Sequence, residues 1–376
     1  MPDPIPVLEV LVSTQMGGGP QHVYTLATAL RARGFAPAVA GPRDGAMAET
    51  FDAAGIELIE MSTHRLRPDI APRLARLIAR RGIRLVHSHG KGAGVYGRLA
   101  ARLAGVPAIH TFHGIHFERY PPGVRQAYLA LERRLATWTY AVVNVSRAQE
   151  AEGLARGLFR SAQSRVIPNG VDVAALMGRA LPPGQARARL GVPGRSIVVG
   201  CAARFDAVKG HALLMDAVGC VTDPALRLVL LGSGAEEERL RARAGADDLR
   251  GRVLFAGEIP DAACVFPAFD LYVSASSKEG LPLAVLEAMA LGLPVVATDI
   301  AGHRELFGDG AGGLVAPTTR AVAHAIQVLA ADGERRRALG ADNRERARRF
   351  DAARMIDATE CLYREALGRL PCPRCP

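Results

Sequence analysis

A lone acidic residue in an apolar segment is the first feature of this sequence that could carry chemistry. Residues 281–292 contain one charged side chain, Glu287, and Glu279 lies just before them. A helix that is apolar nearly all round is buried, and a buried carboxylate is costly unless it is paired or hydrogen-bonded. Backbone N–H groups at the start of such a helix suit a diphosphate. The segment indicates either a ligand site or a structural Glu287 that an arginine or a backbone amide satisfies.

The same segment carries its own start and stop signals. Pro282 fits the first helical position, and Gly292 with Pro294 ends the apolar run. We therefore expect the helix to begin at Pro282 and to end by Gly292.

A second candidate group lies in ARFDAVKG, residues 203–210. Only three of the 47 basic residues are lysines, and one of them, Lys209, stands beside a glycine in this segment. So rare a residue in a predicted loop suggests a specific role. The alternative is a surface lysine in a turn.

Several histidines raise the question of a metal site. His87 and His89 share one face of a predicted strand, while His110, His113 and His116 recur every third residue. The triplet would not line one helical face, and no Cys, Asp or Glu at ligand spacing completes a zinc shell. We therefore predict no catalytic metal, and His113 on local grounds could be a structural histidine.

The elements that must position these residues alternate between strand and helix. The run Val7–Val12, the loop MGGGPQH and the segment VYTLATALRARG read as strand, glycine-rich turn and helix, and a second series of this kind begins near Arg195. Such alternation predicts an α/β fold of two Rossmann-like, doubly wound parallel-sheet domains that face a cleft. Residues 172–194, rich in Gly and Pro, are the best linker candidate.

Composition agrees with a compact enzyme of two domains. The chain has 376 residues, of which 49% are hydrophobic and 5% aromatic. Six scattered cysteines do not resemble a disulfide framework, and the pair Cys372 and Cys375 supplies at most half of a zinc site. The first residues lack the basic region of a secretory signal, and no apolar run approaches a membrane-spanning length. We expect a cytoplasmic protein.

Charge leaves several classes of partner open. The formal net charge is +10, and 44 of the 47 basic residues are arginine. It suits nucleic acid, anionic lipid or nucleotide substrates, and equally a solvated surface. Residues 119–140 combine Arg125, Arg133 and Arg134 with Trp138, and could lie at an anionic membrane surface. The alternative is an ordinary helix that packs its apolar face on the sheet.

The motifs together resemble those of retaining glycosyltransferases with the GT-B fold, family 4 in particular. The pair Glu279 and Glu287 resembles the family's Glu-x7-Glu signature, and ARFDAVKG resembles its donor-phosphate element. VIPNGVD (166–172), LVLLGSG (228–234) and AGHRE (301–305) follow in the expected order. GGGPQH and residues 84–114 resemble acceptor-domain motifs of bacterial polysaccharide-assembly members. The resemblance covers about residues 7 to 350.

The resemblance implies a role for each candidate residue. Arg204 and Lys209 would hold the donor diphosphate, Glu279 the transferred sugar and Glu287 the ribose, while His113 would face the sugar from the N-terminal domain. A leaving diphosphate develops negative charge that fixed cations stabilise, which agrees with the first of these roles. The remaining donor-binding candidates are backbone or loop positions: Gly18, Gly19, Gly232, Gly257, Ile259, Leu281, Leu283 and Ala284.

The resemblance also implies how the chain is organised. We predict an N-terminal acceptor-binding domain at 1–178 and a C-terminal nucleotide-sugar-binding domain at 195–345. A final helix and tail at 346–376 could pack back on the first domain.

The predicted function is transfer of a sugar, with retention, from a nucleotide-diphosphate donor to a glycan or lipid-linked hydroxyl. UDP-linked donors come first, no cofactor or metal is required, and weak association with an anionic membrane surface is expected. Two alternatives remain: a nucleotide-sugar epimerase of similar architecture, and a basic nucleic-acid-binding protein, although we expect no nucleic-acid partner. A nicotinamide dehydrogenase fits poorly because the first turn lacks G-x-G-x-x-G.

Overall fold

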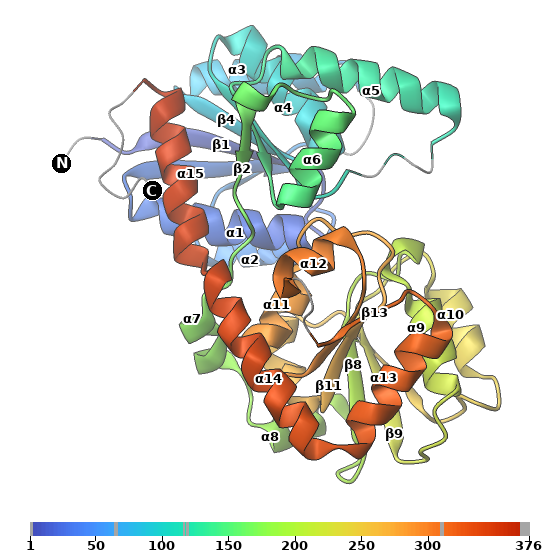
Figure 1. Ribbon diagram of the computed structural model, residues 1–376. Helices are drawn as coiled ribbons and strands as arrows, with labels where there is room; N and C mark the ends of the chain where they lie inside the picture. Colours follow the sequence, from blue (N-terminus) through green and yellow to red (C-terminus); the bar gives the residue numbers. More distant parts are fainter. Residues whose placement is uncertain (1–2, 64–66, 116, 118–119, 309–311, 369–376) are drawn as a thin grey trace. The chain divides into compact units, whose positions relative to one another are not determined.

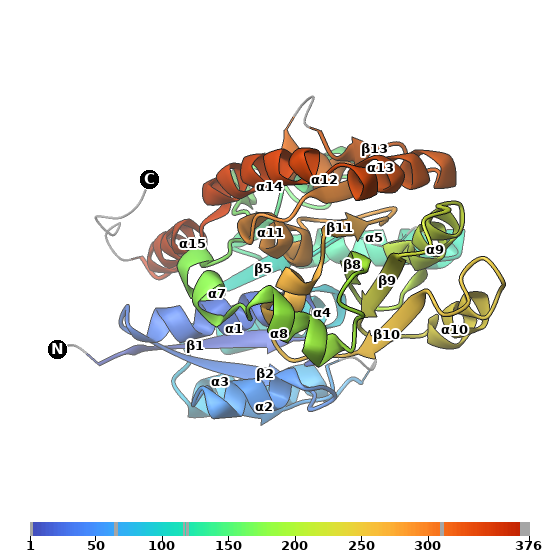
Figure 2. The ribbon, with the colours of Figure 1, turned by 90° about the horizontal axis from the view of Figure 1, so that it is seen from below.

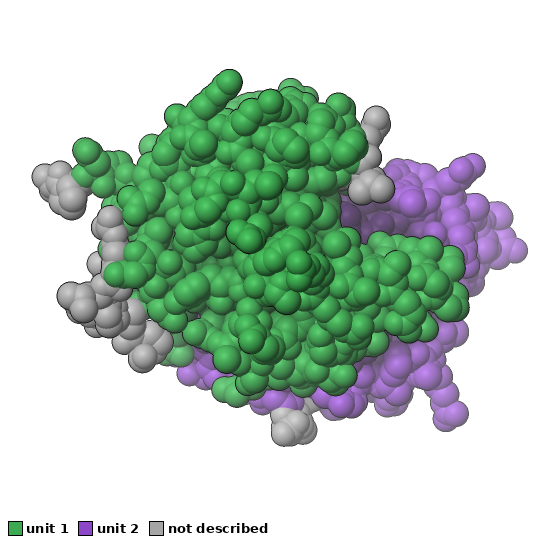
Figure 3. All heavy atoms as spheres, turned by 90° about the horizontal axis from the view of Figure 1, so that it is seen from above, with its two compact units in different colours: residues 1–169, 352–376 green, residues 170–351 purple. Residues whose placement is uncertain are grey.

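The chain divides into two compact units, each built on one parallel sheet. The computed structural model describes residues 3–63, 67–115, 117, 120–308 and 312–368. Unit 1 comprises residues 1–169 and 352–376, and unit 2 comprises residues 170–351 (Figure 3). In each unit helices cover the sheet, so the predicted α/β fold of two doubly wound domains is confirmed (Figures 1 and 2).

Unit 1 holds a seven-stranded sheet with the strand order β3-β2-β1-β4-β5-β6-β7, and all of its paired strands are parallel. The strands are β1 (Ile5–Leu11), β2 (Phe35–Gly41), β3 (Leu58–Glu60), β4 (Leu85–His89), β5 (Ala108–Phe112), β6 (Ala141–Asn144) and β7 (Ser164–Val166). The helices are α1 (Gly18–Arg31), α2 (Met47–Ala53), α3 (Ile70–Arg80), α4 (Lys91–Ala104), α5 (Pro122–Ala136), α6 (Arg147–Ala155) and α15 (Ala352–Ala366).

Each face of the unit 1 sheet has its own helical layer, because successive side chains of a strand point to opposite faces. Val7 packs with residues of α1 and α15, whereas Leu8 and Val10 pack with residues of α3 and α4. In Figure 1 the red helix α15 accordingly lies beside the blue strands of this unit. Glu9 follows Val7 by two positions and therefore points to the face that α1 and α15 cover.

Helix α15 is tied to unit 1 by charge as well as by packing. Arg33 forms ion pairs with Asp357 and with Glu360, the latter at 2.7 Å, and Glu360 is buried. Arg364 also pairs with Glu360, at 2.9 Å. Two guanidinium groups thus compensate one buried carboxylate on the last helix, as a buried charge requires.

Unit 2 holds a six-stranded sheet with the order β10-β9-β8-β11-β12-β13, again with parallel pairs. The strands are β8 (Ile197–Ala202), β9 (Leu226–Leu231), β10 (Val253–Gly257), β11 (Leu271–Ser274), β12 (Val295–Thr298) and β13 (Leu314–Val315). The helices are α7 (Val173–Arg179), α8 (Pro183–Leu190), α9 (His211–Gly219), α10 (Glu237–Ala244), α11 (Leu283–Ala290), α12 (Ala301–Phe307), α13 (Thr319–Ala331) and α14 (Gly333–Ala347), with 3-10 turns at η2 (Ala207–Lys209) and η3 (Ala262–Ala268).

The chain passes between the units at places that differ from the sequence prediction. The crossings lie at 169/170 and 351/352, where we predicted changes near 178 and 345. Val171 pairs with Asp351 in an isolated bridge, and its N–H donates to Phe350 O at 2.9 Å, so the two crossing segments run together. Residues 172–194, predicted as a linker, form α7 and α8 within unit 2, because Asp172 caps α7 and Pro182 precedes α8.

Both sheets reverse their strand order beside the first strand of the unit, between β1 and β4 and between β8 and β11. Open parallel sheets bind ligands at the carboxyl ends of the strands at this switch point. Within the described ranges, no helix has the length and apolar character needed to cross a membrane.

Candidate active site

Four loops of unit 2 are joined by backbone hydrogen bonds at the carboxyl ends of their strands. Phe205 N donates to Ser233 O at 2.7 Å, which links the loops after β8 and β9. Gly232 N donates to Gly257 O at 2.8 Å, and Ser277 N donates to Val208 O at 2.9 Å, which adds the loops after β10 and β11. The candidate residues of unit 2 up to Leu281 lie on these loops.

Two glycines allow these loops to approach so closely. Gly210 has φ +70°, and a Cβ there would lie 2.0 Å from Ala275 O. Gly232 has φ +134°, and its Cβ would lie 2.2 Å from Ala203 O. A residue with a Cβ would collide with the neighbouring backbone at either position, so only glycine fits. Gly232, a predicted donor-binding position, therefore has a packing role between the loops.

Lys209 and Glu279 form an ion pair at the switch point of unit 2. Lys209 Nζ lies 2.8 Å from Glu279 Oε1 and 2.9 Å from Oε2, and Ser276 Oγ donates to Oε1 at 2.7 Å. Their side chains are 21% and 11% exposed. Burial alone would raise the pKa of Glu279, but Lys209 and the Ser276 hydrogen bond outweigh it and hold the pKa below its usual value. The structure thus brings two predicted catalytic residues together as an ionised pair.

Arg204 is the more exposed cation of the same loop. Its side chain is 51% exposed and pairs with Asp206 at 2.9 Å. An exposed pair of this kind contributes little to stability, so the guanidinium can exchange its partner for an anionic ligand.

Helix α11 begins one residue later than predicted and ends, as predicted, before Gly292. Pro282 is its N-cap with ψ 113°, and the helix runs from Leu283 to Ala290 with Leu291 as its C-cap. Gly292 follows with φ +76°, a conformation that glycine favours at the end of a helix. The cap makes no side-chain hydrogen bond, because the proline side chain offers no acceptor to the first-turn N–H groups. Leu281 is buried, which leaves its backbone as the part that could meet a ligand.

Glu287 lies on the half-buried face of α11. Leu283, Ala284 and Glu287 are half-buried, while Val285 and Leu286 point into the core. Within the described part of the chain no group hydrogen-bonds its carboxylate. The structure therefore does not show the alternative interpretation, in which an arginine or a backbone amide satisfies Glu287. Burial raises its pKa to about 7, with Arg179 lowering it and Asp261 raising it further.

The end of β10 and the loop after it carry two of the predicted donor-binding positions, Gly257 and Ile259. Gly257 ends the strand with φ +69° at a shift of register, and Ile259 is half-buried. Ser233 Oγ donates to Glu258 Oε1 at 2.6 Å, and Arg179 pairs with Asp261 at 2.8 Å. These contacts hold both ends of the loop.

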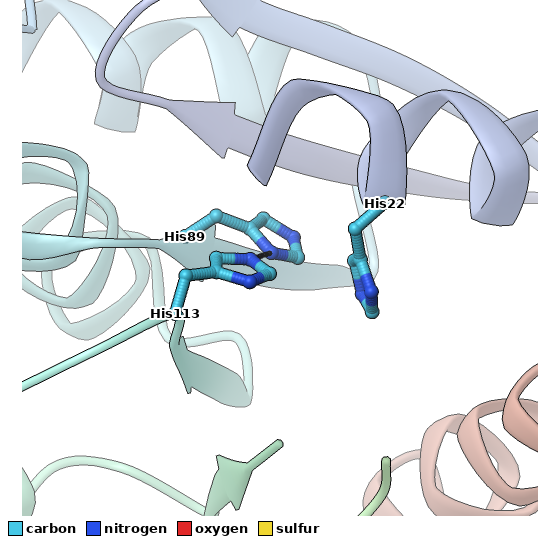
Figure 4. A group of neighbouring side chains, drawn as sticks. All are labelled: His22, His89 and His113. Carbon is cyan, nitrogen blue, oxygen red and sulfur yellow. Dashed lines mark hydrogen bonds between the residues drawn. The ribbon is translucent and has the colours of Figure 1, made fainter. Parts of the chain in front are cut away.

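In unit 1 three histidines meet at the β1/β4 switch point. His89 ends β4, His113 follows β5 and His22 lies on α1 (Figure 4). His89 Nδ1 and His113 Nε2 are 3.1 Å apart, and the rings of His22 and His113 are 4.9 Å apart. Burial, with His22 and His89 nearby, lowers the pKa of His113 well below its usual value. His113 is therefore neutral at pH 7.

Gly18 and Gly19 form the first turn of α1, and a Cβ at Gly19 would lie 3.6 Å from the His113 ring.

The prediction that no acid accompanies these histidines was wrong. Glu9 Oε2 lies 2.7 Å from His89 Nε2, and Tyr363 Oη donates to Glu9 Oε1 at 2.6 Å. The sequence signal was available, because Glu9 is the one charged residue in the apolar run Val7–Val12. His110 belongs elsewhere and contacts Ser88 at 3.0 Å. His116, Cys372 and Cys375 lie outside the described residues.

A metal ion is the obvious ligand to test against this cluster. His22, His89 and His113 each offer a nitrogen, and the three lie within 4.8 Å of one another; Glu9, His87 and His89 form a second such group. The ring centres of His89 and His113 are 5.3 Å apart, and His89 Nδ1 lies 3.1 Å from His113 Nε2. The difference is about the sum of the two distances from ring centre to nitrogen, so both nitrogens lie close to the line that joins the ring centres. The two nitrogens thus point at each other in a nearly in-line hydrogen bond. To bind one tetrahedral ion, His89 Nδ1 and His113 Nε2 would both have to direct their lone pairs at the ion, away from the line between them. The arrangement of these two side chains therefore fits a hydrogen bond better than a metal site.

Comparison with known proteins decides the family. The family model Glycosyltransferase Family 4 matches residues 16–175, and the model Glycosyl transferases group 1 matches residues 184–346. The D-inositol 3-phosphate glycosyltransferase of Saccharomonospora viridis is 34% identical over 312 residues, covering 76% of this chain and 70% of the relative. The chain is a glycosyltransferase of family 4.

Further relatives extend the match over nearly the whole length of this glycosyltransferase. The phosphatidyl-myo-inositol mannosyltransferase of Mycobacterium tuberculosis is 29% identical over 94% of each chain. HepE of Anabaena, solved in complex with UDP and glucose, superposes with a TM-score of 0.85 at 24% identity, over 96% of this chain and 100% of its own. That likeness shows the fold, which is GT-B as predicted.

Proposed function

We propose that this glycosyltransferase transfers a sugar from a UDP-linked donor to a hydroxyl group with retention of configuration and without a metal. The observation that carries the proposal is the Lys209–Glu279 pair at the switch point of unit 2, in the loops after β8 and β11. It puts a cation and a carboxylate where open parallel sheets bind their ligands. HepE, of the same fold, was solved with UDP.

Each residue of the site would meet a different part of the donor. Lys209 and Arg204 would neutralise the diphosphate, together with backbone amides of residues 281–284, among which Pro282 has no N–H to give. Glu279, kept ionised by Lys209, would accept hydrogen bonds from the sugar hydroxyls. Glu287, which lacks a protein donor among the described residues, would accept from the ribose.

Retention would follow from attack on the face that the leaving group occupies. The acceptor oxygen bonds to the anomeric carbon while the bond from that carbon to the β-phosphate oxygen breaks, and the hydroxyl proton passes to the leaving phosphate. Neither Glu279, paired with Lys209, nor Glu287 is assigned as a nucleophile. The protein then contributes positioning and charge stabilisation.

A thermal-shift screen with nucleotide-diphospho-sugars, followed by product analysis in EDTA, tests the proposal. A bound donor stabilises the fold by about 3 kcal/mol at a hundred times its dissociation constant. We expect UDP-sugars to give the largest shift, and an α-linked product when an acceptor hydroxyl is supplied. An isomerised sugar without acceptor would indicate the epimerase. Activity lost in EDTA and restored by Mg²⁺ would contradict metal independence.

Donor affinity should depend on pH through Glu287. Its pKa of about 7 means that the carboxyl is mostly protonated below that pH, whereas ribose hydroxyls donate to the ionised form. Affinity should therefore weaken as pH falls below 7, by up to about tenfold per pH unit, and level off above it. Calorimetric titration with UDP across this range measures the effect. The Glu287→Gln protein should bind weakly and without this slope; an unchanged slope in the variant would assign the titration to another group.

The acceptor is proposed to be a glycan or a lipid-linked sugar, with weak binding to an anionic membrane surface. The relatives named above include enzymes whose names specify phosphatidyl-myo-inositol or inositol phosphate. On α5, Leu129 and Leu135 are buried, as for an ordinary packed helix. Its outer side nevertheless exposes Leu131 with Arg133 and Arg134.

Flotation with vesicles tests the membrane proposal. We expect the protein to float with anionic vesicles at low salt, because arginines near an anionic surface contribute about 1 kcal/mol each. The double variant Arg133→Ser, Arg134→Ser should float less. A matched control, Arg239→Ser with Arg250→Ser, removes the same charge from exposed positions of unit 2 and should float as wild type does. Equal recovery on neutral vesicles would contradict an electrostatic attachment.

A further inference from the structure

The buried carboxylate of Glu9 is connected to His113 by hydrogen bonds through the imidazole of His89. Glu9 and His89 are almost fully buried, and His89 Nε2 lies 2.7 Å from Glu9 Oε2. His113 Nε2 lies 3.1 Å from His89 Nδ1 in the nearly in-line contact described above. The three side chains come from β1, the end of β4 and the residue after β5, on the same face of the sheet.

A second line of hydrogen bonds reaches the other oxygen of the same carboxylate. Tyr363 Oη, from α15, donates to Glu9 Oε1 at 2.6 Å. His87 Nδ1 lies 2.6 Å from Tyr363 Oη, and His87 Nε2 lies 2.7 Å from Thr111 Oγ1. Since the tyrosine proton goes to Glu9, His87 must donate to the tyrosine and accept from the threonine. Both lines therefore donate toward Glu9.

The charge of Glu9 determines which nitrogen of His113 carries the proton. An ionised carboxylate only accepts hydrogen bonds, so His89 carries its proton on Nε2. With His89 neutral, its Nδ1 is bare and accepts the Nε2–H of His113. His113 Nδ1 is then bare too, and it is a buried atom with no hydrogen-bond partner in the described part of the chain. The protein leaves one acceptor open at the end of the line.

We propose that Glu9 is a positioning residue for sugar transfer: acting through His89, it holds His113 in the Nε2–H tautomer, so that Nδ1 accepts a hydrogen bond from a hydroxyl of the substrate sugar. This inference rests on the proposed function, because it presumes a sugar at His113. In catalytic triads a carboxylate holds an imidazole in one tautomer in the same way, and the wrong tautomer lowers kcat strongly even when the geometry of the site is unchanged. His113 does not transfer a proton in this scheme.

Two variants separate this role from a structural one. Glu9→Leu removes the acceptor from an otherwise apolar strand and should lower kcat about ten- to a hundredfold, with the donor KM within about threefold of wild type. The matched control, Tyr363→Phe, removes a hydrogen bond to the same carboxylate but leaves the line to His113 intact. It should lower the melting temperature while kcat stays close to wild type. In a His113→Ala background, Glu9→Leu should have no further effect on kcat.

A spectroscopic readout tests the tautomer without reference to activity. Long-range ¹H–¹⁵N spectra of ¹⁵N-histidine-labelled wild-type protein, with His113 assigned from the His113→Ala spectrum, should show a protonated Nε2 and a bare Nδ1. A protonated Nδ1 would overturn the proposal, as would a folded Glu9→Leu protein with unchanged kcat, or an equal loss of kcat in both backgrounds. If the wild type transferred no sugar, the proposed function would fail while the spectra still decided the tautomer.

Discussion

Replacing Lys209 with methionine is expected to lower kcat by about 10²–10³-fold. The ammonium group lies 2.8 Å from Glu279 Oε1 and is about one-fifth exposed, so it is positioned before a ligand arrives. In the proposed reaction it meets the charge that develops on the leaving diphosphate, and the loss of such a group raises the barrier by about 3–4 kcal/mol. Methionine retains most of the apolar stem. Steady-state kinetics with kcat and KM determined separately should show the larger change in kcat.

Controls distinguish this effect from damage to the loop. Lys209→Arg keeps the charge in a planar fork rather than a compact ammonium and should retain intermediate activity. Arg239→Met removes an exposed cation of the same unit, 75% accessible, and should leave kcat unchanged. Thermal unfolding of every variant checks the fold. A folded Lys209→Met protein with nearly wild-type kcat would refute the proposed site.

Replacing Glu279 with glutamine should lower kcat by about 10²-fold, although the amide has the same shape. The carboxylate accepts hydrogen bonds from Lys209 Nζ and Ser276 Oγ, and these partners keep its pKa below the usual value. Hydrogen bonds from sugar hydroxyls to a charged carboxylate are stronger than those to an amide, which has a single acceptor oxygen. Turnover with saturating donor and acceptor measures the loss.

A double-mutant cycle tests whether the pair acts as a unit. The protein carrying both Lys209→Met and Glu279→Gln should be about as impaired as the worse single variant, because each change already breaks the ion pair. Strictly multiplicative losses would show that the two residues act independently.

The same pair should make stability depend on pH. A lowered folded-state pKa contributes stability above the ordinary value of 4.5, and this contribution is lost as pH falls below it. Glu279→Gln should flatten that part of the melting-temperature profile. A parallel profile in wild type and variant would contradict the assignment.

Local signals accounted for much of the fold and for part of the site. Alternating strands and helices, glycine-rich turns and the lone acid Glu287 are visible within short windows, because helix and strand periods act over neighbouring residues. The segment 172–194 misled the prediction: its Gly and Pro residues suggested a linker, yet Asp172 caps α7, and Pro182 and Gly191 cap the two ends of α8. The start of α11 was one residue off because Pro282 occupies the cap.

By itself the sequence determined two parallel α/β domains, the family, and the loops in which Arg204, Lys209, Glu279 and Glu287 lie. Only the tertiary structure decided which of these residues meet. Lys209 and Glu279 are 70 positions apart, Glu9 and His89 are 80 apart, and Glu9 and Tyr363 are 354 apart. Such contacts depend on strand order, on register and on the return of α15 to unit 1. These are long-range packing outcomes that no local pattern encodes, so the charge network behind His113 became visible only once the sheet was assembled.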